Sequence, residues 1–177
     1  MMYDNIIKEF NTEDGHFRKK EVYYVKNHFY ELKDKLLTEV NNIIENIDKE
    51  VPLSLYYILF ILSEFKCKEL YPLLIKLLNM KYPKDENFFN YFGDGLFENM
   101  CDFLAATYNG DYLSLDNIIN NSELNADNRG FAVNMDYYFY KKNIKTREEV
   151  IQHLKDVTKL LVNQFKDNDK DSFASSL

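Results

Sequence analysis

The chain has 177 residues, a length typical of one domain that buries enough surface to fold without a disulfide or a metal. Apolar residues make up 46% of it and aromatic residues 16%, which excludes the disordered classes. The net charge of −7 is spread evenly along the chain. Nucleic-acid backbones require a clustered basic surface, so we expect no nucleic-acid partner.

Cysteine usage and hydropathy indicate the compartment. Cys67 and Cys101 lie far apart, each inside an apolar helical pattern, which is typical of buried free thiols in a reducing cytosol. Residues 1–15 are acidic and lack the apolar segment of a secretory signal. The longest mostly apolar run, Leu53–Leu62, is too short to cross a bilayer. We therefore expect a cytoplasmic protein with no membrane partner.

The first half of the chain shows helical periodicity. Residues 1–15 predict one or two loose helical turns, and Phe17–Phe29 a short helix. A longer helix ending near Asp48 follows from apolar residues at steps of four, four, three and four, which place them on one stripe: Leu32, Leu36, Val40, Ile43 and Ile47. Pro52 suits the first turn of the next helix, which runs to Phe65. Together with a helix over 70–78, it predicts a helical hairpin with a three-residue turn.

Glycines and polar turns divide the second half. Gly93–Asp94–Gly95 predicts a turn in which Asp94 caps the helix that follows, and Asn109–Gly110–Asp111 ends that helix. A shorter helix around residues 115–119 and another ending near Lys142 come next. Thr146 and Glu149 form a capping box that starts the final amphipathic helix.

The pattern contains no convincing strand. Seven or eight helices in hairpins, recurring at roughly 35–40 residues, predict an all-α fold arranged as an α-α superhelix of HEAT-like helical hairpins. A compact bundle is the competing arrangement. We expect a single helical-repeat domain over 1–166, followed by a polar, frayed tail over 167–177.

Several short segments within residues 16–161 carry a family likeness. They are Phe17–Arg18, Ile58–Phe65, Tyr71–Leu74, Gly93–Glu98, Phe103–Ala106, Gly110–Asp111 and Asn128–Ala132. In these segments the chain resembles the DUF1186 family of uncharacterised bacterial helical proteins. The resemblance implies a HEAT-like superhelix and no known activity. Some relatives look like this domain followed by a Cys-rich zinc knuckle similar to that of the SecA C-terminus, and this chain has no such cysteine cluster.

The acidic face of the helix after Gly93 allows two interpretations. Asp94, Glu98 and Asp102 lie at i, i+4 and i+8, so their carboxylates follow one helix face. Aligned oxygens suit a hard cation such as Mg²⁺ or Ca²⁺. Alternatively, Asp94 caps the helix, and Arg129, whose planar fork suits a carboxylate, pairs with Glu98 or Asp94 and joins neighbouring hairpins. We favour this structural interpretation and expect no metal.

No other residue pattern indicates catalysis. His16, His28 and His153 share no metal-like spacing with each other or with the cysteines. The chain contains no glycine-rich phosphate loop, no G-x-S-x-G and no H-E-x-x-H. We therefore expect no catalytic residues, no cofactor and no enzymatic activity.

Adjacent aromatic residues are the remaining signal. Neighbours on a helix face different ways, so one of each pair is expected outside the core, where Tyr and Phe favour binding. The candidate binding surface is Tyr56, Tyr57, Phe92, Tyr137 and Tyr140. A core built of aromatic residues is the alternative.

The expected function is thus a non-enzymatic α-solenoid that binds a protein or peptide, with its oligomeric state left open. Two alternatives remain. One is an acidic immunity or antitoxin-like protein that neutralises a basic partner. The other is a metal-dependent enzyme that uses the face of Asp94, Glu98 and Asp102.

Overall fold

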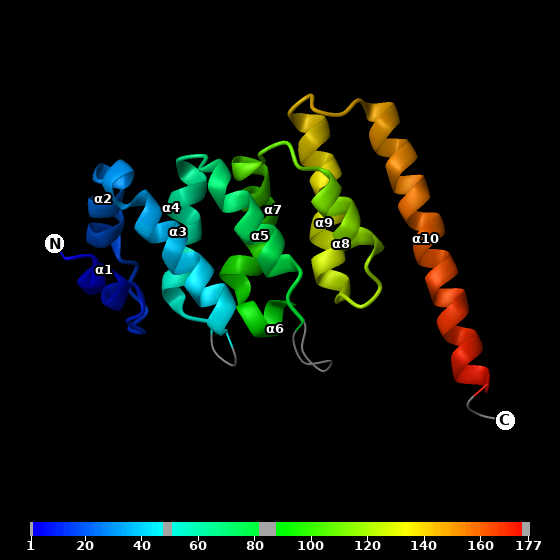
Figure 1. The fold of residues 1–177 in the computed structure, drawn as a ribbon, viewed down its shortest axis with the longest axis horizontal. Coiled ribbons are helices and arrows are strands. Elements are labelled where there is room, and N and C mark those ends of the chain that lie inside the picture. The colour runs from blue at the N-terminus through cyan, green and yellow to red at the C-terminus, as the bar shows by residue number, and fades with distance from the viewer. Residues whose placement is uncertain (1, 48–50, 82–87, 175–177) are drawn as a thin grey trace. The chain divides into compact units, whose positions relative to one another are not determined.

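The computed structural model describes residues 2–47, 51–81 and 88–174, with side chains through Asn163. These residues form ten α-helices and one 3-10 turn and contain no strand, so the predicted all-α class is confirmed (Figure 1). The contacts divide the chain into two compact units, Met1–Asp111 (unit 1) and Tyr112–Leu177 (unit 2). The single helical-repeat domain over 1–166 stays a prediction. None of the described helices is long and apolar enough to span a membrane.

Unit 1 contains seven of the helices. They are α1 (Tyr3–Phe10), α2 (Lys19–Asn27), α3 (Phe29–Asn46), α4 (Leu53–Glu64), α5 (Tyr71–Leu78), preceded by the 3-10 turn η1 (Lys68–Leu70), α6 (Phe88–Phe92) and α7 (Asp94–Thr107). The short helices α1 and α6 bring the number above the seven or eight predicted. The predicted stripe of α3 shifts by one residue near its end, where Ile44 is buried and Ile43 is only partly buried.

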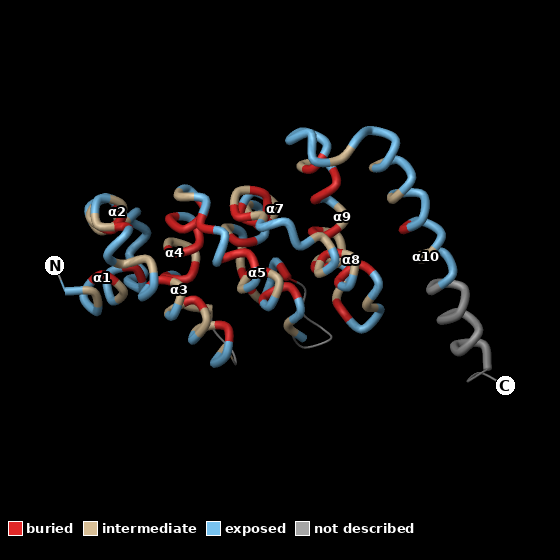
Figure 2. Tube along the Cα trace, turned by 45° about the horizontal axis from the view of Figure 1, so that its top comes forward, coloured by how far each residue is buried: buried red, intermediate tan, exposed pale blue. Residues whose placement is uncertain are grey.

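α4 is the central helix of unit 1. It is apolar on nearly every side, and α7, α3, α1 and α2 all pack against it. Figure 2 shows the resulting concentration of buried positions in α4, α5 and α7. The Asn11 side chain accepts a hydrogen bond of 2.8 Å from the Ser54 backbone N–H, so the loop after α1 satisfies a donor in the first turn of α4.

The α4–α5 connection reverses the chain through a left-handed residue. Lys66 has φ of 53°, its N–H donates to the Ser63 carbonyl and the Cys67 N–H donates to the Leu62 carbonyl. This is the Schellman pattern that closes a helix. α4 and α5 were predicted to form a helical hairpin. In the structure, the helices that contact α5 most are α3 and α7, apart from the adjoining η1.

A close approach of backbone and ring joins α7 to α4. A Cβ added at Gly95 would lie 3.1 Å from Cδ2 of Tyr56, closer than side chains normally approach. Gly95 therefore lets the Tyr56 ring lie directly against the first turn of α7. The predicted turn is also shorter than expected, since Gly93, with φ of 78°, is the N-cap and Asp94 is already helical.

Unit 2 contains three helices, α8 (Leu113–Asn120), α9 (Ala126–Lys141) and α10 (Arg147–Ala174). α8 packs on α9 and α9 packs on α10. The predicted capping box is confirmed: the Thr146 N–H donates to Oε2 of Glu149 (2.7 Å), and the Glu149 N–H donates to Oγ1 of Thr146 (3.2 Å). α10 stays helical to Ala174, through most of the predicted tail, and residues 175–177 lie outside the described residues.

Candidate functional site

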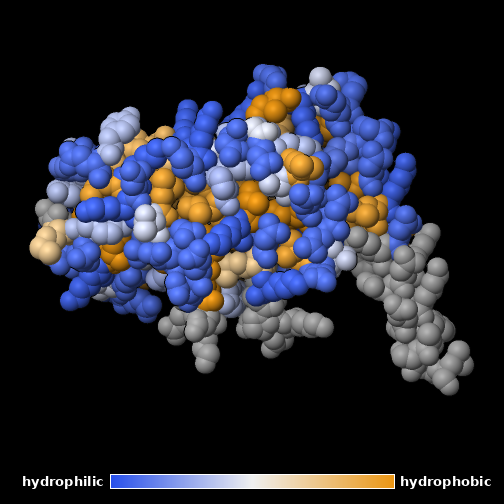
Figure 3. All heavy atoms as spheres, in the orientation of Figure 1, coloured by the Kyte–Doolittle hydropathy of each residue, from blue (hydrophilic) through white to orange (hydrophobic). Residues whose placement is uncertain are grey.

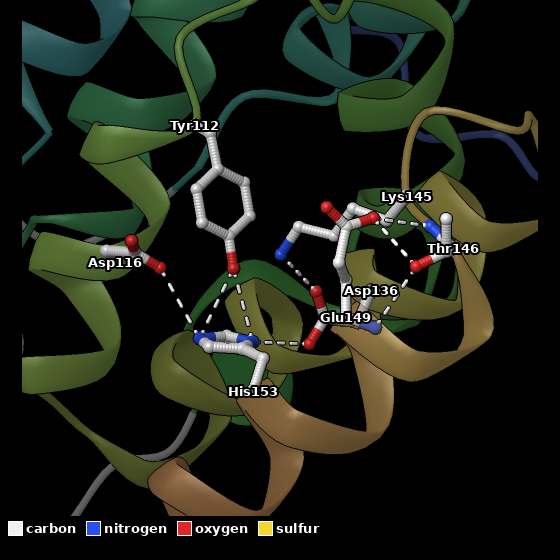
Figure 4. A network of polar contacts seen from close by, with 7 residues as sticks. All are labelled: Tyr112, Asp116, Asp136, Lys145, Thr146, Glu149 and His153. Carbon is white, nitrogen blue, oxygen red and sulfur yellow. Dashed lines mark hydrogen bonds and ion pairs between the residues drawn. The ribbon is translucent and has the colours of Figure 1, made fainter.

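A buried carboxylate in α9 lies at the centre of a polar network in unit 2 (Figure 4). The Asp136 side chain is only 3% exposed, and each of its oxygens accepts from a different side chain. Lys145 Nζ donates to Oδ1 at 2.9 Å, and His153 Nδ1 donates to Oδ2 at 2.5 Å. Lys145 lies between α9 and α10 and His153 lies in α10, so one carboxylate attaches both the connection and the last helix to α9.

The other side of His153 faces α8. Its Nε2 lies 3.4 Å from Oδ1 of Asp116, and the Tyr112 hydroxyl lies 3.1 and 3.2 Å from the two ring nitrogens. Because Nδ1 donates to Asp136, Nε2 is the nitrogen available to the Tyr112 hydroxyl. Figure 4 shows the imidazole between the two carboxylates.

Aromatic faces complete the site. Lys145 Nζ lies 3.5 Å from the centroid of the Tyr112 ring, and the Tyr112 ring meets Phe139 edge-on at 5.6 Å. A cation over an aromatic face is stabilised by the ring quadrupole, more so when water is largely excluded. Lys145 is thereby held by a carboxylate and by a ring, and both belong to unit 2.

The second carboxylate of the network, Asp116, lacks a hydrogen-bond donor at one oxygen. Oδ1 of Asp116 is buried and forms no hydrogen bond within the part of the chain that the structure describes, and Nε2 of His153 lies 3.4 Å from it. A buried carboxylate oxygen without a donor is costly.

The network connects α8, α9 and α10. Asp136, Lys145, His153 and Tyr112 are directed at one another, as Figure 4 shows. Among the side chains that the structure describes, which end at Asn163, no group of three or more His, Cys, Asp or Glu has the geometry to hold a metal ion.

Sequence reasoning missed this network, although one signal was present. Asp136 lies three residues before Phe139 and four after Ala132, and all three are buried on one face of α9. His153 likewise lies on the buried face of its helix, α10, four residues before the buried Val157. An ionisable residue on an apolar stripe requires a partner, and here each is the partner of the other.

A comparison with protein families identifies the chain. The matching family is described as "Protein of unknown function (DUF1186)", and the match covers residues 1–176. The chain belongs to the DUF1186 family. No curated protein and no solved structure matches it.

The acidic face predicted in this DUF1186 chain lies on α7. Asp94, Glu98 and Asp102 are all exposed. Gly93 occupies the N-cap position that was predicted for Asp94, which corrects that prediction by one residue. The Asp94 carboxylate still lies in the first turn, where it favours the positive end of the helix dipole.

Arg129 has a partner that was not predicted. Its Nε donates to the backbone carbonyl of Ile119 at 2.9 Å, which joins the end of α8 to the start of α9. Burial lowers the pKa of the guanidinium from its usual value. Its pairing with Glu98 or Asp94 stays a prediction.

The five aromatic residues predicted for a binding surface differ in exposure. Tyr137 and Tyr140 are exposed on α9, and Tyr56 and Tyr57 are partly buried on α4. Phe92 is buried, because its ring packs on Phe88 at 4.4 Å, so its place on the predicted surface was wrong. The run of aromatic residues over 88–92 did not indicate which of them would be buried in the short α6.

The two cysteines have little nucleophilic character. Burial raises the pKa of the Cys67 thiol and raises that of Cys101 to about 11. A thiol that stays protonated at neutral pH is a poor nucleophile.

Proposed function

We propose that this DUF1186 protein is a non-enzymatic α-solenoid module of the cytoplasm that binds a protein or peptide segment. The observation that carries the proposal is a row of four aromatic rings in unit 1, here called the aromatic row: Phe17, Tyr57, Tyr56 and Phe60. Successive ring centroids are 5.4, 6.1 and 6.5 Å apart. Phe17 is 59% exposed and Phe60 38% exposed, so both ends of the row reach solvent.

Buried rings hold the row in place. Phe10 stacks on Tyr57 at 4.7 Å, and Phe103 lies 6.3 Å from Tyr56. The Tyr57 hydroxyl accepts from the Arg18 backbone N–H, and Gly95 leaves room for the Tyr56 ring. Aromatic side chains fixed before binding lose little entropy when a partner docks, which is how interface hot spots achieve affinity. Figure 3 shows other hydrophobic residues at the surface among hydrophilic ones.

The test is to remove the exposed ends of the row. A Phe17→Ala, Phe60→Ala variant should keep the fold, since both side chains are exposed at the surface. It should lose the proteins that the wild type captures from extracts of its host, with an affinity loss of about 2 kcal/mol or more. Tyr30→Ala is the matched control, because Tyr30 is an exposed aromatic residue outside the row. If wild type and double variant enrich the same proteins equally, the row does not bind them.

A second candidate function follows from an acidic groove in the same unit. The groove, of about 660 Å³, is lined mainly by residues of α1 and α3, including Tyr3, three carboxylates (Asp4, Asp34 and Glu39) and one ammonium group (Lys35). Burial, and to a smaller extent the charges of Glu39 and Asp4, raise the pKa of the Tyr3 hydroxyl. This groove favours the immunity-like alternative, in which a basic partner is attracted by charge. The association rate would then fall steeply with added salt, whereas binding by the aromatic row would depend on salt only weakly.

A further inference from the structure

The last helix of unit 2 has two different faces. One face is attached to α9: Val157 is buried, and His153 binds Asp136. Figure 2 shows that most other described positions of α10 are exposed. The polar network and Val157 therefore account for one side of α10 only.

An adjoining face of α10 is largely apolar. Ile151, Leu154, Thr158 and Val162 follow one another at steps of three, four and four, which places them on one helical stripe. Ile151 is 40% exposed, Leu154 39% and Val162 45%. We call this stripe, with the adjoining Lys155 and Lys159, the α10 outer face.

The outer face contains a shallow groove with basic edges. A groove of about 400 Å³ is lined by Ile151, Leu154, Lys155, Thr158 and Lys159. The Thr158 hydroxyl donates to the carbonyl of Leu154 at 2.7 Å, so its donor is already used within the helix. The polar character of the groove comes from the two ammonium groups.

An exposed stripe of this kind indicates a missing partner surface. Outer faces at the ends of stacked helices are normally polar, because they remain in water. Scattered exposed apolar residues need no explanation, but large ones at regular helical spacing match the anchors of helix recognition.

We propose that the α10 outer face docks an amphipathic helix of a partner protein, whose apolar stripe is flanked by carboxylates. The apolar residues at i, i+3 and i+11, with Thr158 at i+7, fit the face of one helix. Lys155 and Lys159 are one turn apart along the groove, where carboxylates of the docked helix would reach them.

Lys155 and Lys159 also argue against two other occupants of this face, a second copy of the chain and a membrane surface. Any two-fold pairing with a second copy places Lys155 and Lys159 of both chains along one shared groove, and like charges repel. A membrane surface is attracted by several clustered cations, whereas this chain has a net charge of −7 and Asp156 lies 3.8 Å from Lys159.

This inference is independent of the proposed function. It uses contacts of unit 2, whereas the aromatic row belongs to unit 1. Loss of binding at one surface leaves the other unchanged.

The test uses two designed helical peptides, identical in their leucine stripe, with either glutamates or lysines at the flanking positions. Binding to the full chain is measured by fluorescence anisotropy. The wild type should prefer the glutamate peptide by about tenfold, as expected for two exposed ion pairs. A Lys155→Glu, Lys159→Glu variant should reverse that preference. Leu154→Glu should weaken both peptides at least tenfold.

The matched control is Lys19→Glu, Lys20→Glu, which changes the net charge equally on exposed positions of α2. It should bind as the wild type does. Equal affinity for both peptides, or a preference that the Lys155 and Lys159 reversal leaves intact, overturns the proposal. A chain dimer that Leu154→Glu dissociates assigns the face to a second copy. Cosedimentation with phosphatidylcholine–phosphatidylglycerol vesicles that Leu154→Glu abolishes assigns it to a membrane. Both results would contradict the proposal.

Discussion

In unit 1, α4 is enclosed by apolar side chains of several helices, whereas in unit 2 one face of α10 is held by charges and the other is in water. Leu55, Leu59 and Leu62 of α4 are fully buried. In unit 2, Asp136 binds Lys145 before α10 and His153 within it. Apolar packing tolerates changes of pH and salt, whereas a polar network fails when any one member is lost. The two units should therefore respond differently to the same perturbation.

The largest expected effect is in the core of unit 1. Leu59→Ala removes a fully buried side chain and leaves a cavity among well-packed neighbours, so it should lower the free energy of unfolding by about 3–4 kcal/mol. Urea denaturation measures the loss. Leu53→Ala, at an exposed position of the same helix, should cost much less. Equal losses would show that α4 is not the apolar centre of unit 1.

The next effect breaks the network of unit 2. Asp136→Asn keeps the shape of the side chain but removes the charge that Lys145 and His153 share. Because those two are partly exposed and water can solvate them, the cost should be about 2–3 kcal/mol rather than that of a fully buried pair. Hydrogen exchange should show α10 losing protection first. Glu148→Gln, an exposed neighbour, should leave exchange unchanged. Uniform loss of protection over α8, α9 and α10 would contradict the role given to Asp136.

A smaller effect concerns the start of α10. Thr146→Ala removes the side chain that accepts from the Glu149 N–H, at a cost of about 1 kcal/mol. The loss should appear as faster exchange of amides in the first turn, with α4 unaffected. Thr146→Ser keeps the hydroxyl and should restore protection. A variant with alanine that exchanges like the wild type would show that the network alone holds the helix.

The smallest effect is an acid-dependent attachment in unit 1. The Lys33 ammonium, together with hydrogen bonds from the Glu69 N–H and the Cys67 thiol, lowers the pKa of the Glu69 carboxyl to about 2. A carboxyl with a lowered pKa in the folded state stabilises it above its ordinary value of 4.5. That stabilisation is lost as the pH falls through about 2. Glu69→Gln should remove this part of the pH dependence, measured as the difference in unfolding midpoints of the two proteins between pH 6 and pH 2. Because Glu69 is exposed, the difference should be small, and a parallel pH dependence would contradict the assignment.

Periodicity and local chemistry predicted most helices. The stripe of α3 follows from the spacing of Leu36 and Val40, and the start of α10 follows from Thr146 and Glu149, whose bonds span three residues. Local rules also predicted the turn near Gly93, with an error of one residue at Asp94. These features depend on residues that are close in sequence, so the sequence contains them directly.

The polar network could not be predicted in the same way. Tyr112 and His153 are 41 residues apart, and their contact depends on how α8, α9 and α10 pack. The apolar neighbours of Asp136 indicated burial but not which cation would pair with it. The exposure of Phe92 was also decided by packing, since Phe88 covers its ring. Tertiary contacts of this kind need the three-dimensional arrangement.

The protonated state of the two thiols has a practical consequence. At neutral pH neither Cys67 nor Cys101 offers much thiolate, so both should react slowly with maleimides and with small disulfides. A single cysteine placed at the exposed Gln152 would then be labelled well before the natural ones. A spectroscopic reporter could therefore be attached to α10 without first replacing Cys67 and Cys101 in unit 1.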